Sequence, residues 1–117
     1  MSGAATAASA GSRVLAVSIT GGGADFGFTH MHTFDASLAT VTGASGGVTY
    51  AWSLTEVDGD TETWDFTGQG TSAMTPTVRG SFAGGVSSAT AVCTVTDNVT
   101  GASAVSNTVT FRYINTA

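Results

Sequence analysis

Apolar and polar residues alternate with a period of two along most of the chain. Strict alternation is typical of a strand with one buried face, and no stretch has a competing helical period. Short turn-forming runs separate the alternating stretches, namely "GASGG", "DGD", "TGQG", "GSFAGG" and "DNVTG". The residues predicted to share the buried face are Leu15, Val17 and Ile19; His32, Phe34, Ala36 and Leu38; Val48, Tyr50, Trp52 and Leu54; Ala89, Ala91, Cys93 and Val95; and Asn107, Val109, Phe111 and Tyr113. The pattern therefore predicts an all-β sandwich of two antiparallel sheets with about seven strands.

One alternating stretch, "THMHTFDASLATVTG", changes parity partway along. Its apolar positions end at Leu38 and resume at Ala39 and Val41. A parity change within one apolar pattern indicates an extra residue in the strand. We therefore expect a β-bulge between Leu38 and Thr40.

The composition excludes two classes of partner. The chain has 117 residues, enough for one domain with a core of its own, and only 9% are charged. Its basic residues are Arg13, Arg79 and Arg112, and the formal net charge is −5, so it cannot neutralise a nucleic-acid backbone. No apolar run is long enough to span a bilayer, which makes a membrane partner equally unexpected.

The opening "MSGAATAASAGS" lacks the basic and apolar regions of a signal peptide, so we expect the protein to stay in the compartment of its synthesis. We divide the chain into a low-complexity, extended N-terminal arm, residues 1–12, and one domain, residues 13–117.

The single cysteine refines the fold prediction. In an immunoglobulin-like sandwich, a tryptophan on the third strand packs near an inward position of the penultimate strand, and Trp52 and Cys93 fit these two places. The facing position on the second strand falls among Ala36, Leu38 and Ala39, so no disulfide can form. We therefore interpret Cys93 as a small core residue rather than a reactive thiol. The predicted centre of the core comprises Tyr50, Trp52, Cys93, Val95 and Phe111.

Two long stretches resemble a known group of domains. "VTGASGGVTYAWSL" and "SATAVCTVTDNVTGASAVSNTVTF" are similar to the immunoglobulin-like and PKD-like domains of structural proteins in tailed bacteriophages. The resemblance covers about residues 30–113 and leaves residues 1–28 unexplained. It implies a virion structural protein, foremost a capsid decoration subunit of the cement or head-fibre type. Such a subunit would be made in the host bacterial cytoplasm, sit on the virion surface as a homo-oligomer, and bind the major capsid protein without covalent bonds.

Two groups of residues are candidates for a metal site. His30 and His32 in "HMH" share one strand face but lack an evident third ligand, so we expect a solvated or core-edge pair. The run "EVDGDTETWD" holds five acidic residues whose order does not fit a calcium loop of the EF-hand type. Asp58-Gly59 is a strong turn dipeptide, so we predict a solvated acidic hairpin between the third and fourth strands. Neither a metal nor a cofactor is expected.

Catalytic arrangements are also unsupported by the sequence. No serine lies in a nucleophile elbow, and no glycine-rich loop leads into a helix, so we do not expect an enzyme. Asp97 and Asn98 are interpreted as turn residues whose side chains bind nearby backbone groups.

The expected activity is adhesion to a protein partner. A Thr- and Val-rich sandwich without lysine leaves its edge strands open to pairing unless a partner covers them. In the arm, small side chains allow close backbone approach, and Arg13 could bind a carboxylate. The candidate partner-binding residues are Ser2, Gly3, Ser12, Arg13, Phe26 and Phe28.

Two alternative functions stay open. The first is a tail accessory subunit of the same fold. The second is a carbohydrate-binding or adhesive module of a bacterial surface protein, which would need an aromatic platform outside the core. Phe26, Phe28, Trp64 and Phe66 are the residues that could form such a platform and contact a host glycan.

Overall fold

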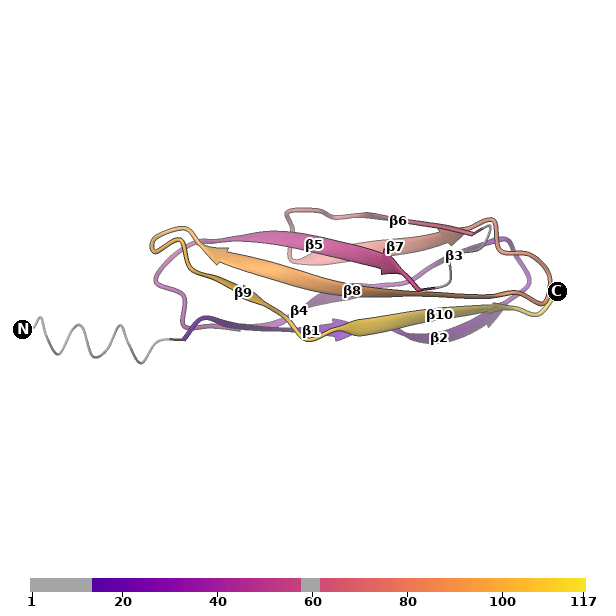
Figure 1. Cartoon of the computed structure of the whole chain (residues 1–117), viewed down its shortest axis with the longest axis horizontal. Coiled ribbons are helices and arrows are strands. Elements are labelled where there is room, and N and C mark those ends of the chain that lie inside the picture. The colour runs from indigo at the N-terminus through magenta and orange to yellow at the C-terminus, as the bar shows by residue number, and fades with distance from the viewer. Residues whose placement is uncertain (1–13, 58–61) are drawn as a thin grey trace, which may run out of the picture.

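The computed structural model describes residues 14–57 and 62–117, which fold into two stacked β-sheets (Figure 1). Within these ranges there are ten strands and no helix that could cross a membrane. The strands are β1 (Ala16–Gly21), β2 (Gly23–Gly27), β3 (Met31–Thr33), β4 (Ala36–Thr42), β5 (Val48–Glu56), β6 (Thr63–Thr67), β7 (Ala73–Arg79), β8 (Val86–Asp97), β9 (Ser103–Val105) and β10 (Val109–Asn115). The predicted arm, residues 1–12, lies outside the described ranges.

The strand order is that of an immunoglobulin-like sandwich, which confirms the predicted fold class. One sheet has the order β1-β4-β7-β6, with β3 pairing β7 beyond the end of β4, and the other has the order β2-β10-β8-β5, with β9 pairing β8. About seven strands were predicted, and three of those seven are interrupted: the first as β1 and β2, the second as β3 and β4, and the last as β9 and β10. The sheets are also not wholly antiparallel, because β2 runs parallel to β10.

A glycine run carries the chain from one sheet to the other between β1 and β2. Gly21 and Gly22 have φ values of 127° and 83°, where residues with a Cβ are strained. A Cβ on Gly21 would clash with the carbonyl oxygen of Asp35, and one on Gly22 would lie 2.6 Å from that of Thr110. Only glycine therefore lets the chain leave β4 and join β10 at this point.

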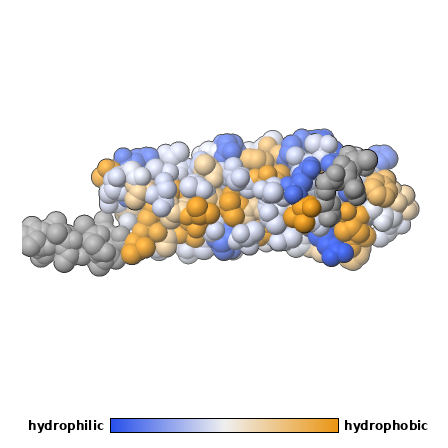
Figure 2. All heavy atoms as spheres, in the orientation of Figure 1, coloured by the Kyte–Doolittle hydropathy of each residue, from blue (hydrophilic) through white to orange (hydrophobic). Residues whose placement is uncertain are grey.

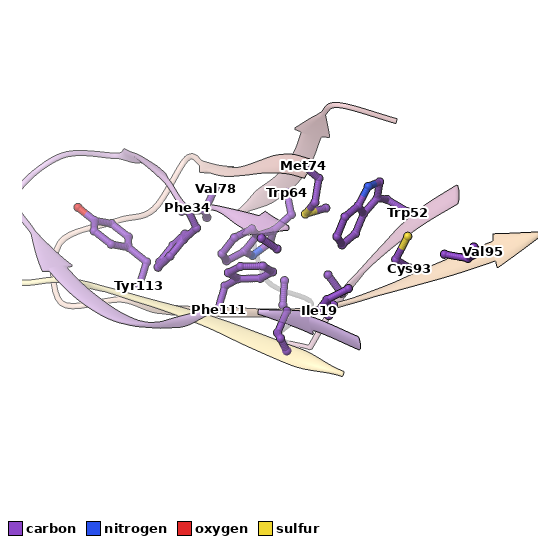
Figure 3. Close-up of a cluster of buried hydrophobic side chains, with 14 residues drawn as sticks. Ile19, Phe34, Trp52, Trp64, Met74, Val78, Cys93, Val95, Phe111 and Tyr113 are labelled. Carbon is purple, nitrogen blue, oxygen red and sulfur yellow. The ribbon is translucent and has the colours of Figure 1, made fainter. Parts of the chain in front are cut away.

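The core lies between the two sheets and contains most of the residues that the alternation placed inward. The prediction that Asn107 faces inward was wrong: it is exposed, because it lies between β9 and β10 rather than in a strand. Trp52 and Cys93 are direct neighbours on β5 and β8, with 3% and 0% of their surfaces exposed, and Figure 3 shows them side by side. Farther along, the rings of Phe34, Trp64 and Phe111 pack with centroids 5.5–6.3 Å apart. The fully buried or nearly buried apolar residues are Ile19, Phe34, Ala36, Trp52, Trp64, Met74, Val78, Ala89, Ala91, Cys93, Val95, Val109, Phe111 and Tyr113, with Tyr50 packed against them.

The predicted bulge is present in β4. Ser18 of β1 pairs with Thr40, and the next residue, Ile19, pairs with Leu38, so Ala39 has no partner. Ala39 is exposed, and inward-facing positions resume at Val41. The expectation that Ala39 itself faces inward was wrong, because the extra residue of a bulge is the one that leaves the pattern.

The acidic hairpin predicted between the third and fourth strands is not formed. β5 and β6 belong to different sheets, so the connection between them crosses from one sheet to the other. Glu62 is only 4% exposed and accepts a hydrogen bond from the hydroxyl of Ser87 at 2.7 Å, which makes the prediction of a solvated segment wrong at this residue. The turn predicted at Asp58-Gly59 lies outside the described residues.

Candidate attachment surface

The largest exposed apolar side chains lie on and beside the edge strand β2. Phe26 and Phe28 are 68% and 77% exposed. Phe26 is paired with Ile114 of β10, which is paired in turn with Val86 of β8, so the three form one row across the sheet. The row lies on the outer face, because Tyr113 and Ser87, the neighbours of Ile114 and Val86, are buried. We call Phe26, Phe28, Val86 and Ile114 the β2 surface.

The outward direction of the two phenylalanines is fixed by the residue between them. Gly27 faces the core so closely that a Cβ would lie 2.5 Å from the hydroxyl oxygen of Tyr113. That hydroxyl donates to the carbonyl of Thr29 at 2.7 Å and accepts from the Thr29 N–H at 3.2 Å. The backbone on both sides of Phe28 is therefore held by the core, and the two rings are presented on a rigid support.

His32 is also part of this support. Its ring stacks on Tyr113, with centroids 4.7 Å apart and an interplanar angle of 8°, and its Nε2 lies 3.0 Å from Oδ2 of Asp25. His30 precedes β3 and is exposed. In the part of the chain that the structure describes, no three His, Cys, Asp or Glu side chains are grouped closely enough to hold a metal ion.

Further apolar residues lie at the same end of the sandwich. Phe82, 52% exposed, lies in the turn between β7 and β8, where its ring lies 3.2 Å from the position that a Cβ on Gly85 would take. The Gly85 carbonyl accepts from the N–H of Asn115, which ties this turn to the end of β10. Figure 2 shows apolar residues along the viewed face, including a group towards this end. Sequence reasoning missed Phe82 and Val86, although a phenylalanine within "GSFAGG" has no strand to bury it.

One positive charge lies beside the β2 surface. Arg112 is exposed on β10, between Ala24 of β2 and Ser88 of β8. It has no ion-pair partner among the described residues, whereas Arg79 binds Asp65 with an Nε to Oδ2 distance of 3.1 Å. A partner that covers the β2 surface could therefore place a carboxylate against Arg112.

Four of the other candidate binding residues, Ser2, Gly3, Ser12 and Arg13, lie outside the described residues. Trp64 is buried and Phe66 is half-buried against the core, so they cannot join Phe26 and Phe28 in an aromatic platform. They face inward because β6 follows the same alternation as the other strands.

The turn after β8 behaves largely as predicted. Asp97 accepts hydrogen bonds from the N–H groups of Ser45 at 2.8 Å and Val99 at 2.9 Å, which together hold the pKa of its carboxyl below the usual value of 3.8. The Oδ1 of Asn98 instead accepts from the side-chain hydroxyl of Thr49. These contacts hold the turn between β8 and β9 in one conformation.

The buried thiol offers no nucleophile. Burial raises the pKa of Cys93 above its usual value of 9.0, so the thiol stays protonated at neutral pH. Its side chain is inaccessible at 0% exposure. The β2 surface, in contrast, offers exposed apolar contact area.

No protein-family model matches the chain, and no curated protein matches it. Among solved structures, the chain is similar to the crystal structure of domains 4 and 5 of the S-layer protein SbsC, with 19% sequence identity and a TM-score of 0.44. The alignment covers 86% of this chain and 51% of the solved one, so the chain spans about half the length of the solved chain it matches.

Proposed function

We propose that the protein is a structural subunit of a bacteriophage particle that decorates the capsid by binding the major capsid protein without catalysis. The resemblance of residues 30–113 to domains of phage structural proteins supports the phage assignment. The low content of charged residues, 9%, supports a subunit whose surface is covered by neighbours rather than by water alone.

The observation that carries the proposal is the β2 surface. Isolated apolar side chains are common on protein surfaces, but here Phe26 lies in one row with Ile114 and Val86, and Phe28, just beyond the end of β2, adds a second exposed ring. Aromatic residues that are held in place lose little conformational entropy on binding and often dominate the energy of an interface.

The test is attachment to capsids with Phe26 and Phe28 both replaced by serine. Capsids lacking the protein, from the virus whose genome encodes it, are mixed with each variant and sedimented. We expect the double variant to bind about tenfold more weakly, because two anchoring rings are lost. The control is Val99→Ser, which alters a residue that is 67% exposed in the turn after β8, at the opposite end of the sandwich (Figure 1).

Two results would contradict the proposal. Undiminished binding by the double variant would show that attachment uses another surface. Binding of the wild-type protein to purified tails and not to capsids would show that the decoration assignment is wrong.

A further inference from the structure

Two amide side chains each bind both backbone polar groups of a residue in an edge strand. β5 is an edge strand of its sheet and pairs only with β8. Near its centre, the N–H of Trp52 donates to Oε1 of Gln69 at 2.6 Å, and Nε2 of Gln69 donates to the Trp52 carbonyl at 2.8 Å. Gln69 lies in the turn between β6 and β7, so it reaches this edge from the opposite sheet.

The same arrangement recurs on the other side of the sandwich. β1 is an edge strand of the first sheet and pairs only with β4. The N–H of Ile19 donates to Oδ1 of Asn107 at 2.8 Å, and Nδ2 of Asn107 donates to the Ile19 carbonyl at 3.1 Å. Asn107 lies between β9 and β10, again on the opposite sheet.

The backbone N–H and C=O groups that these two amides bind are the groups with which an added strand would form hydrogen bonds. In an antiparallel pair, alternate residues direct their N–H and C=O groups towards the neighbouring strand. Cys93, opposite Trp52, directs both of its groups to Ser106 on its other side. The backbone groups of Trp52 and Cys93 are therefore not hydrogen-bonded to each other. The N–H and C=O of Trp52 point away from β8, at the free edge of β5.

We propose that Gln69 and Asn107 are edge guards, which keep β5 and β1 from pairing with a strand of a second copy of the protein. Lysine, a common protector of edge strands, is missing from the sequence. Each guard occupies a residue inside its strand rather than at an end, so neither edge offers an uninterrupted row of free backbone groups.

The first test is Gln69→Ala, with Asn98→Ala as the matched control. Asn98 is also an exposed amide, but its side chain binds the hydroxyl of Thr49 rather than an edge backbone. For Gln69→Ala we expect a melting temperature lower by about 5 °C and exchange of the Trp52 amide hydrogen about tenfold faster in dilute solution. As its concentration rises, sedimentation velocity should show copies associating, whereas Asn98→Ala should sediment like the wild type.

A second variant excludes lost volume as the cause of association. Gln69→Met keeps the length of the side chain and adds no charge, but it has no donor for the Trp52 carbonyl and only a weak acceptor for the Trp52 N–H. It should associate like Gln69→Ala. Sedimentation like the wild type would contradict a guard that acts through hydrogen bonds.

A third variant separates edge pairing from partial unfolding. Ser53 is exposed beside Trp52, so adding Ser53→Lys to Gln69→Ala places a charge at the edge without restoring the lost hydrogen bonds. We expect the lowered melting temperature to persist while the association disappears. The proposal is overturned if Gln69→Ala does not associate, or if Ser53→Lys leaves its association unchanged.

Discussion

The edge strands β5 and β2 border the same sheet but are built in opposite ways. β5 directs its largest side chain, Trp52, into the core opposite Cys93, and Gln69 covers its backbone at that point. β2 directs Gly27 towards the core and its largest side chain, Phe26, towards solvent. The largest side chain of β5 therefore stabilises the fold, whereas the largest side chain of β2 is exposed apolar surface that the fold does not require. We therefore expect the proposed partner to bind at β2 rather than at β5.

The largest expected effect is at the core beneath β5. Cys93→Asp would bury an unpaired carboxylate at a position with no exposed surface, and we expect no cooperative thermal transition. Cys93→Ala, the control, should lose about 1 kcal/mol of unfolding free energy. Circular dichroism of both variants measures this, and labelling of the native thiol should be slow. A stably folded Cys93→Asp variant would place residue 93 outside the core.

The corresponding change at β2 is Gly27→Ala. The added methyl would meet the Tyr113 hydroxyl at 2.5 Å, so β2 must move, at a cost of about 1–3 kcal/mol. Gly47→Ala is the control, because its nearest atom, Nδ2 of Asn98, would be 3.6 Å away. Thermal unfolding measures both. Equal stability of the two variants would mean that β2 is not pressed against Tyr113.

A smaller, pH-dependent effect is expected at Asp97, which lies opposite the first residue of β5. Its pKa is lowered in the folded state, so its contribution to stability is present above pH 3.8 and is lost as the pH falls through the lowered value. The wild type should therefore melt above Asp97→Asn at neutral pH, and this gap should close in acid. Melting curves across this range test the prediction, and a gap that does not depend on pH would contradict it.

The smallest effect on stability is expected on the outer face of β2. Phe26→Ser should change the free energy of unfolding by less than about 0.5 kcal/mol, because the ring is already 68% exposed. Denaturant unfolding measures this. A large loss of stability would mean that Phe26 supports the fold, and it would remove the contrast between the two edges.

The alternation of the sequence was sufficient to predict the fold class and most of the core. Ala89, Ala91, Cys93 and Val95 all face inward, because a strand has no other way to bury one set of side chains. Sheet membership could not be predicted, since the crossing at Gly21 and Gly22 depends on contacts with Asp35 and Thr110, which are distant in sequence. A local pattern contains no information about such contacts.

The candidate surface and the guards were predicted less completely. Phe26 and Phe28 were identified as residues that could contact a partner, whereas Gln69 in "TGQG" looks like an ordinary turn residue and Asn107 was predicted to face inward on the last strand. Their role depends on which edge backbone lies within reach of the amide, and only the three-dimensional arrangement supplies that distance.

The parallel pairing of β2 with β10 also has a mechanical consequence. Residue 14 and the carboxyl end of β10 lie at opposite ends of the sandwich (Figure 1). Tension applied between them pulls β2 and β10 in opposite directions along their common axis, from Gly23 beside Phe111 to Gly27 beside Asn115. The hydrogen bonds between the two strands are then loaded together in shear rather than opened one after another. A subunit tethered at one end and pulled from the other would resist extension at the strand that presents its exposed phenylalanine.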